Sequence, residues 1–121
     1  MSAQPGKAIK GKPERRRRRY PRYRSSFPVE VTLFAGTDYQ KLSGHCVDLA
    51  EAGIGILLAA ELNSGEVASL KFTPGGSPKN LEVRGVLRHR RGYHYGFEFL
   101  SLAAEDAALL RRCLQGLPRA D

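Results

Sequence analysis

Hydrophobic and polar residues alternate along the middle of the chain, which is the period of a half-buried β-strand. In the first such segment, from Phe27 onward, Val29, Val31 and Leu33 alternate with more polar neighbours. Five further segments carry apolar residues on one face and are separated by turn-forming residues. These segments are 40–49, 54–58, 68–72, 81–87 and 93–99. The pattern therefore predicts six strands within residues 27–100.

No helical period interrupts these strands, and several short strands without intervening helices are typical of an antiparallel barrel. Gly85 and Gly96 stand alone inside strand patterns, where glycines often mark bends at which a sheet curls. We therefore predict an all-β fold with a C-terminal helix, in which the six strands form an antiparallel β-barrel.

The period changes after the last strand, and residues 101–117 read as one amphipathic helix. Ser101 is a candidate N-cap, and Glu105 and Asp106 suit the positive end of the helix dipole. Gly116 marks the end of the element. The apolar residues that recur at helical spacing are Ala103, Ala107, Leu110, Leu114 and Leu117.

The net charge is +8, and the excess lies at the start of the chain. Residues 1–24 hold ten Lys or Arg against one acidic residue, whereas the remainder is nearly balanced. Residues 1–14 have almost no apolar side chains and are predicted to be a disordered basic tail. Residues 15–26 are predicted to be a flexible, extended arginine-rich arm, because Pro21 disfavours a helix before it. Such asymmetry indicates a polyanionic partner.

The chain has no apolar run near the roughly 20 residues of a membrane span, and its start lacks the apolar core of a secretory signal. We therefore expect a cytoplasmic protein without a membrane span. Cys46 and Cys113 lie far apart without ligand-like neighbours, so they are expected to be buried thiols rather than part of a metal site. No cofactor is expected.

Two short segments carry a functional signal. RRYPR, at residues 18–22, lies just before the first strand, and DLAEAG, at residues 48–53, joins the second strand to the third. Together with the strand order they resemble the PilZ domain family, whose signature is R-x-x-x-R before the first strand and [D/N]-x-S-x-x-G after the second. The resemblance covers about residues 15–117, including YGFEFL at residues 95–100 and the C-terminal helix.

The resemblance implies a receptor for cyclic di-GMP, which carries two phosphodiester anions and two guanines. Arg18 and Arg22 would pair with phosphate oxygens or with guanine, since a guanidinium offers a bidentate fork and a flat face. Asp48 would accept hydrogen bonds from a guanine or orient the arginines. Gly53 would stand where the backbone must bend or approach the ligand.

Three further residues belong to this candidate site. Arg17 would contact a second, stacked nucleotide, and Arg19 lies within the motif. Ala50 stands where the family has a serine, so a hydroxyl is missing, which predicts affinity weakened roughly three- to tenfold. The five-arginine run also satisfies R-x-x-x-R at Arg15 and Arg19, and Arg18 and Arg22 are preferred because they lie nearer the first strand.

These features favour a binding module whose arm folds across the barrel mouth when the dinucleotide supplies counter-charge, and which signals to a protein effector. A PilZ-like adaptor that works without nucleotide is one alternative, and non-specific nucleic-acid binding through the arm is another, less favoured one. His45, His89 and His94 have no partners that suggest catalysis and are assigned surface or packing roles. We therefore predict that the protein is not an enzyme.

Overall fold

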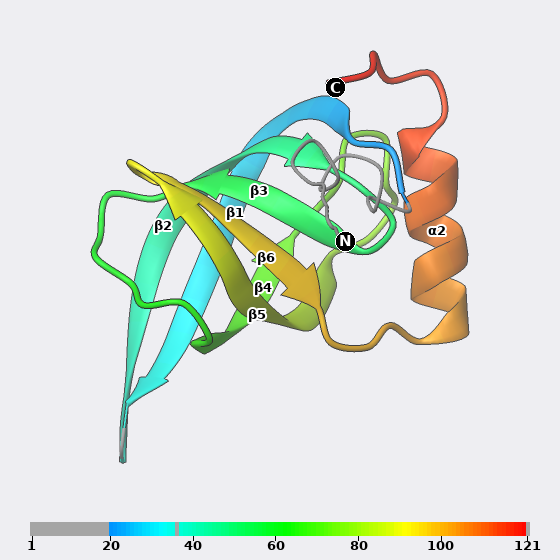
Figure 1. Ribbon diagram of the computed structural model, residues 1–121. Coiled ribbons are helices and arrows are strands. Elements are labelled where there is room, and N and C mark those ends of the chain that lie inside the picture. Colours follow the sequence, from blue (N-terminus) through cyan, green and yellow to red (C-terminus); the bar gives the residue numbers. More distant parts are fainter. Residues whose placement is uncertain (1–19, 36, 121) are drawn as a thin grey trace, which may run out of the picture.

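The computed structural model describes residues 20–35 and 37–120, in which six strands precede one helix. The elements are β1 (Tyr23–Ala35), β2 (Asp38–Leu49), β3 (Gly53–Leu57), β4 (Val67–Phe72), β5 (Leu81–Arg91), β6 (His94–Phe99) and α2 (Ala104–Leu114). The strands are antiparallel and close in the order β1-β2-β3-β6-β5-β4. Figure 1 shows α2 beside the barrel and the β1–β2 hairpin reaching beyond it. The predicted fold class is confirmed.

One hydrophobic core fills the barrel, and the alternating residues of the sequence supply it. Val29, Val31 and Leu33 of β1 are all buried, as the period of two requires. Phe72 of β4 stacks between two further rings, with its centroid 5.5 Å from that of Phe27 and 6.3 Å from that of Phe99. Leu109, Leu110 and Leu114 attach α2 to the same core.

β1 begins at Tyr23, four residues earlier than the alternating pattern suggests. Tyr23 pairs with Leu49 and Arg24 with Asp48, and a bulge separates these pairs from the regular register that resumes at Phe27. The last residues before Phe27 are therefore part of the sheet rather than of a free arm. The polar sequence of these residues does not predict a strand, because they are held by backbone pairing with β2 on one side and with Arg119 on the other.

The aromatic stripe of the last strand is only partly core. Tyr95, Phe97 and Phe99 are buried, and the Tyr95 hydroxyl donates to the Ala60 carbonyl and accepts from the Leu62 N–H. Tyr93, the first residue of the segment 93–99 whose apolar face the sequence pattern assigns to the barrel, is 58% exposed. It lies in the turn between β5 and β6, before the strand that points its neighbours inward.

The helix begins later than predicted, and Ser101 is not its N-cap. α2 starts at Ala104, with Ala103 as an N-cap that makes no side-chain hydrogen bond. The Leu100 N–H still donates to the Arg84 carbonyl, so the chain stays bound to β5 and needs the next residues to reach the helix. At the other end, Gly116 has a φ of +85° and turns the chain away, as its position predicts.

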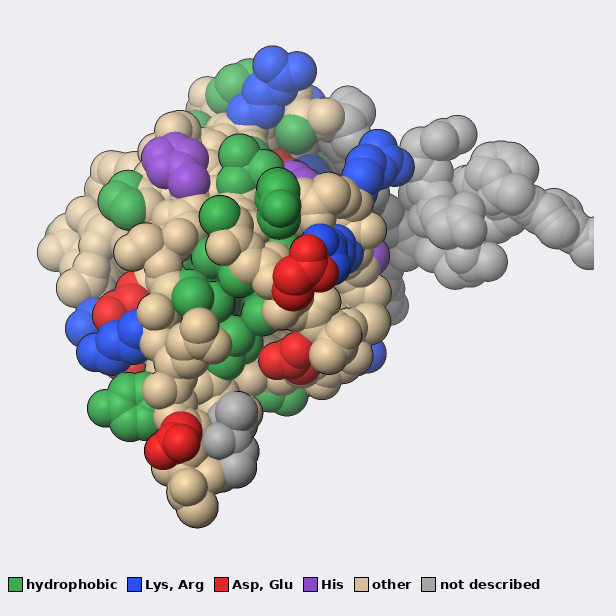
Figure 2. All heavy atoms as spheres, turned by 90° about the vertical axis from the view of Figure 1, so that its left-hand side faces the viewer, with side chains coloured by type: hydrophobic (Ala, Val, Ile, Leu, Met, Phe, Trp, Pro, Cys, Tyr) green, Lys and Arg blue, Asp and Glu red, His purple; other side chains and the backbone are tan. Residues whose placement is uncertain are grey.

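The face of the molecule that points to the left in Figure 1 carries a band of hydrophobic side chains with charged side chains at its borders (Figure 2). Phe34 and Tyr39, near the tip of the β1–β2 hairpin, are among the exposed large hydrophobic residues. No helix within residues 20–35 and 37–120 has both the length and the apolar character that crossing a bilayer requires.

Candidate ligand-binding site

A row of four residues crosses the barrel wall from β2 to β5. Asp48 of β2 pairs with Gly55 of β3, Gly55 pairs with Gly96 of β6, and Gly96 pairs with His89 of β5. Ile54 and Ile56 point into the core, so Gly55 between them faces outward. The two glycines therefore leave space on the outside of the barrel for the polar side chains at the two ends of this row, which we call the glycine row.

The two glycines allow these polar side chains to lie flat against the wall. A Cβ on Gly55 would lie 2.5 Å from the nearer carboxylate oxygen of Asp48, and a Cβ on Gly96 would overlap the His89 ring. A register shift precedes each polar residue, between Cys46 and Asp48 and at the equivalent place in β5. Such bulges change the direction of side chains next to binding sites.

Asp48 is the centre of the polar contacts. Arg22 donates from Nη1 to Asp48 Oδ1 at 2.6 Å, and His94 Nε2 lies 3.2 Å from Asp48 Oδ2. Both members of the ion pair are mostly buried, with 22% of the Arg22 side chain and 14% of the Asp48 side chain exposed. Partial burial reduces solvent screening, so this pair holds its geometry better than an exposed one. It fixes Arg22 beside the glycine row.

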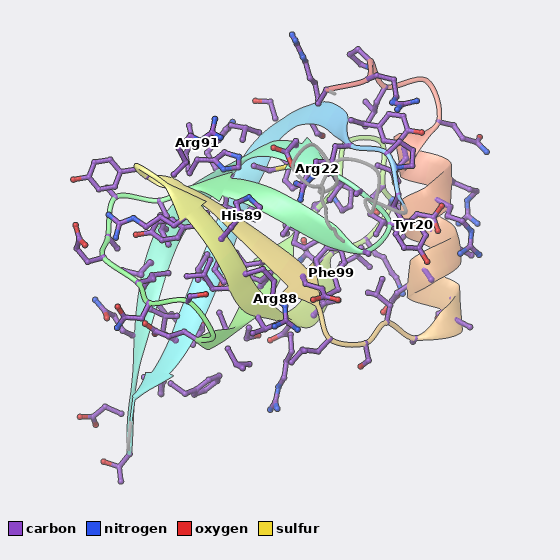
Figure 3. All side chains as sticks on the ribbon, in the orientation of Figure 1. Tyr20, Arg22, Arg88, His89, Arg91 and Phe99 are labelled. Carbon is purple, nitrogen blue, oxygen red and sulfur yellow. The ribbon has the colours of Figure 1, made fainter. Side chains whose placement is uncertain are left out.

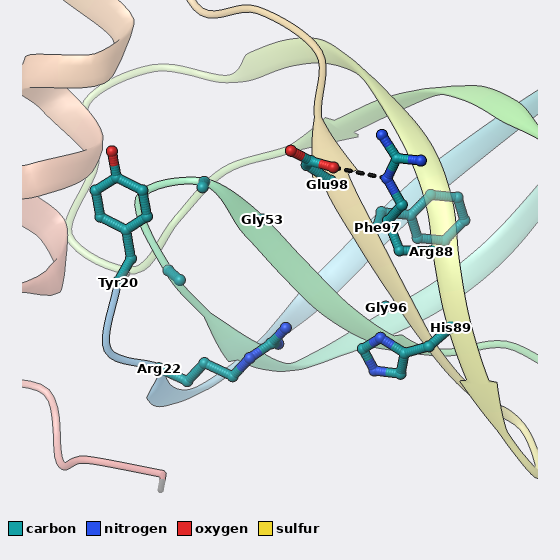
Figure 4. A pocket seen from close by; sticks show the side chains of 10 residues that line it. Tyr20, Arg22, Gly53, Arg88, His89, Gly96, Phe97 and Glu98 are labelled. Atoms are coloured by element: carbon teal, nitrogen blue, oxygen red, sulfur yellow. Dashed lines mark hydrogen bonds and ion pairs between the residues drawn. The ribbon is translucent and has the colours of Figure 1, made fainter. Parts of the chain in front are cut away.

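A cavity of about 490 Å³ lies next to this pair, within the size range of small-molecule sites (Figure 4). Its lining residues are Tyr20, Arg22, Ala50, Ala52, Gly53, Arg88, His89, Gly96, Phe97 and Glu98. A second hollow, of about 420 Å³, is lined by Arg22, Asp48, His89, Arg91 and His94. Arg22 and His89 border both, so the two hollows adjoin.

Basic side chains surround the two hollows. Figure 3 places Tyr20, Arg22, His89 and Arg91 along one side of the barrel. Arg88 is partly neutralised, because its Nε donates to Glu98 at 2.6 Å. Guanidinium and imidazole groups suit phosphate oxygens, and the rings of Tyr20 and His89, which line the larger cavity, suit a planar ring. The arrangement fits a ligand that combines an anion with an aromatic base.

The thiol below Asp48 adds no charge to the site. Cys46 is buried, and its Sγ donates to the Asp48 carbonyl at 3.3 Å. Burial, with a smaller contribution from the Asp48 charge, raises the pKa of Cys46 to about 12. Cys46 is therefore a neutral core residue at physiological pH, and Cys113, which is only partly buried, is a free thiol as well.

The structure brings four of the predicted site residues together. Arg22 and Asp48 form the ion pair, and Ala50 and Gly53 line the larger cavity. Ala50 is 5% exposed and donates its N–H to the Gly53 carbonyl. Gly53 has a packing reason as well, since a Cβ there would lie 2.5 Å from the Phe97 carbonyl oxygen.

Arg17, Arg18 and Arg19, together with the alternative residue Arg15, lie outside the described residues. So does the tail over residues 1–14. The choice of Arg18, rather than Arg15, as the first arginine of the R-x-x-x-R motif therefore stays a prediction.

Sequence reasoning missed several residues of the site. His89 and His94 were assigned surface or packing roles, yet His94 contacts Asp48 and His89 lines both hollows. Arg88, Arg91 and Tyr20 were also not singled out. The isolated Gly96 was a usable signal, because a strand glycine also marks a close approach, but its partner on β5 depends on a register shift that no local pattern reveals.

Gly55→Ala should displace Asp48 from its two partners, since the new Cβ would occupy the place of the carboxylate. We expect a loss of about 1 kcal/mol in the free energy of unfolding, because a short side chain can rotate away but loses charge-assisted hydrogen bonds. Urea denaturation measures this. Gly75→Ala is the matched control, because a Cβ at Gly75 meets open space. Equal stability of both variants would contradict the contact.

Taken together, the fold and the site define a closed β-barrel domain with a polar, cation-rich binding site on its outer wall. A sequence profile of the PilZ domain matches residues 16–116. The chain belongs to the PilZ domain family. A comparison with curated protein sequences finds no significant match.

Solved structures share the fold. The PilZ domain of YcgR from Escherichia coli, solved with c-di-GMP, has 23% sequence identity and a TM-score of 0.66, over 84% of this chain and 91% of that domain. The inhibitor of motility MotI/DgrA of Bacillus subtilis has 21% identity and a TM-score of 0.62, over 82% of this chain. This chain spans half the length of MotI/DgrA.

The PilZ domain of CeSA, from a cellulose-synthesizing bacterium, has 18% identity and a TM-score of 0.59, over 78% of this chain and 95% of that domain. At these identities the likenesses show the fold of the chain and nothing finer.

Proposed function

We propose that this chain is a cytoplasmic receptor for cyclic di-GMP and has no catalytic activity of its own. The observation that carries the proposal is the Arg22–Asp48 pair, 2.6 Å between Nη1 and Oδ1, at the border of the cavity. The family supports the choice of ligand, and one similar structure, that of the YcgR PilZ domain, was solved with c-di-GMP.

The chemistry of the site matches the dinucleotide. The Arg22 guanidinium has five N–H donors, and the bond to Asp48 uses one of its nitrogens, so the others can reach a phosphate or a guanine edge. Asp48 keeps the guanidinium oriented in the free protein. The side chains of Asp48 and His89 lie over Gly55 and Gly96, so the planar groups that a guanine can meet in the cavity are the rings of His89 and Tyr20.

The conformational part of the proposal concerns the residues before β1. Tyr23 already belongs to the sheet and Arg22 is paired with Asp48, so the segment that we expect to reorganise is the basic run before Tyr20. Counter-charge from the two phosphates favours folding of this run across the cavity, with Arg18 and its neighbours as further ligands. Ordering the run changes the surface offered to a protein effector.

Isothermal titration calorimetry with cyclic di-GMP tests the proposal. We expect one saturable binding transition at protein concentrations of tens of micromolar, and no heat under these conditions would remove the function. A nucleotide-independent adaptor is the second candidate, and Ala50 favours it, because the motif's hydroxyl is absent. Non-specific nucleic-acid binding is separated by salt: it weakens steeply with ionic strength and shows little base preference.

Ala50→Ser should tighten binding of cyclic di-GMP about three- to tenfold, because a hydroxyl at the edge of the cavity adds one hydrogen bond to the ligand. Calorimetry on both proteins measures the ratio. Ala52→Ser is the matched control, since Ala52 lines the same cavity outside the motif position. Affinity that is unchanged or weaker in Ala50→Ser would show that the site is packed around alanine.

A further inference from the structure

The backbone around Arg22 is held on both of its edges. On one edge, Tyr23 and Arg24 pair with β2, opposite Leu49 and Asp48. On the other edge lies the chain that follows α2. There the Ala120 N–H donates to the Arg22 carbonyl, and the Arg24 N–H donates to the Pro118 carbonyl, both at 2.8 Å.

Residues 118–120 therefore act as a short edge strand, which we call the clasp. Arg119 of the clasp forms a β-bridge with Tyr23, and its guanidinium carbon lies 5.8 Å from the centroid of the Tyr23 ring. Tyr23 and Leu117 both pack against the core. Figure 1 shows the last segment running from the end of α2 towards the start of β1.

The end of α2 sets the direction of the clasp. Gly116, with a φ of +85°, turns the chain back after the helix, and the Leu117 N–H closes the turn on the Leu114 carbonyl at 3.2 Å. The other half of the site approaches the same helix, since Arg111 Nη1 lies 3.9 Å from Glu51 Oε1. Residues 22–24 and the 48–53 loop thus both lie against the C-terminal part of the chain.

We propose that the clasp positions Arg22 for ligand binding. Without it, the residues around Arg22 would be held by β2 alone, along an edge interrupted by the bulge before Phe27. A backbone held on both edges keeps the guanidinium at Asp48 and beside the cavity before ligand arrives. Only the fraction of molecules with Arg22 in place can bind, so apparent affinity falls with that fraction. The effect on affinity rests on the proposed function.

Ala120→Pro removes the N–H that donates to Arg22, at an exposed position outside the barrel. Ala120→Ser keeps the N–H and is the matched control. Ala103→Pro tests the effect of proline itself, because the φ of Ala103 is −60°, which proline adopts. We expect Ala120→Pro to bind cyclic di-GMP about three- to tenfold more weakly, while both controls bind like the parent and all unfolding midpoints stay similar.

Hydrogen exchange of the Arg24 amide, followed by NMR without ligand, tests the clasp independently of the nucleotide. The parent and Ala120→Ser should protect this amide, and Ala120→Pro should exchange it about tenfold faster. Two results would overturn the clasp. One is a rapidly exchanging Arg24 amide in the parent protein. The other is a parent that binds cyclic di-GMP and an Ala120→Pro variant that binds it with the same affinity. If the Arg24 amide is protected but the parent binds no nucleotide, the proposed function is wrong, and the clasp still positions Arg22.

Discussion

Replacing Arg22 with alanine should weaken the binding of cyclic di-GMP about a hundredfold, because the change removes charge-assisted hydrogen bonds that a smaller side chain cannot restore. The free energy of unfolding should fall by only about 1 kcal/mol, since Asp48 keeps its contact with His94. Calorimetry gives the affinity, and thermal unfolding without ligand gives the stability.

Arg24→Ala is the matched control for this prediction. Arg24 lies two residues away, its side chain is exposed, and its loss removes the same charge. If Arg22→Ala and Arg24→Ala weaken binding equally, the arm acts through its net charge alone. That outcome would contradict a specific role for the Arg22–Asp48 pair and would favour a general polyanion contact.

Gly53→Ala should destabilise the barrel by about 2 to 3 kcal/mol, because its Cβ would lie 2.5 Å from the Phe97 carbonyl oxygen. The obstacle is backbone of the neighbouring strand, so β3 and β6 must separate locally at the pair formed by Gly53 and Glu98. The unfolding midpoint should fall by about 10 °C or more.

The Gly53 experiment separates two reasons for one motif glycine. The sequence suggested that the ligand or a bend requires it, whereas the structure adds a strand contact that exists without ligand. Gly75→Ala, at an open position, should leave the midpoint nearly unchanged. A Gly53→Ala protein as stable as the parent would show that the two strands can absorb a methyl group.

The local alternation of apolar and polar residues was enough to predict the strands of the barrel. The alternation of Val29, Val31 and Leu33 decides which face of β1 is buried, and a slip of one residue would place all three in solvent. Turn residues such as Gly92, with a φ of +61°, separate the strands where the sequence suggests. Burial of one face is a strong constraint, and it is visible in the sequence.

Features that depend on distant partners were less visible. The start of β1 at Tyr23 depends on Leu49 and on Arg119, which lie far away in sequence. The helix begins at Ala104 rather than Ser101 because Leu100 is still bonded to β5. Only the assembled barrel contains the information that decides these boundaries.

The same limit applies to the site. The pairing of Arg22 with Asp48 follows from the two motifs, because each lies next to a strand end. His89 joins the site through its register opposite Gly96, after a bulge, and His94 through the turn at Gly92. A motif search cannot place residues that reach the site by register rather than by spacing.

An NMR titration of the isotope-labelled chain with cyclic di-GMP tests the central claim most directly, since it reports binding and position together. The account predicts saturable shifts concentrated at Arg22, Asp48, Gly55, His89 and Gly96, with the tip of the β1–β2 hairpin unaffected. Spectra that do not change, or shifts that avoid the row from Asp48 to His89, would contradict it.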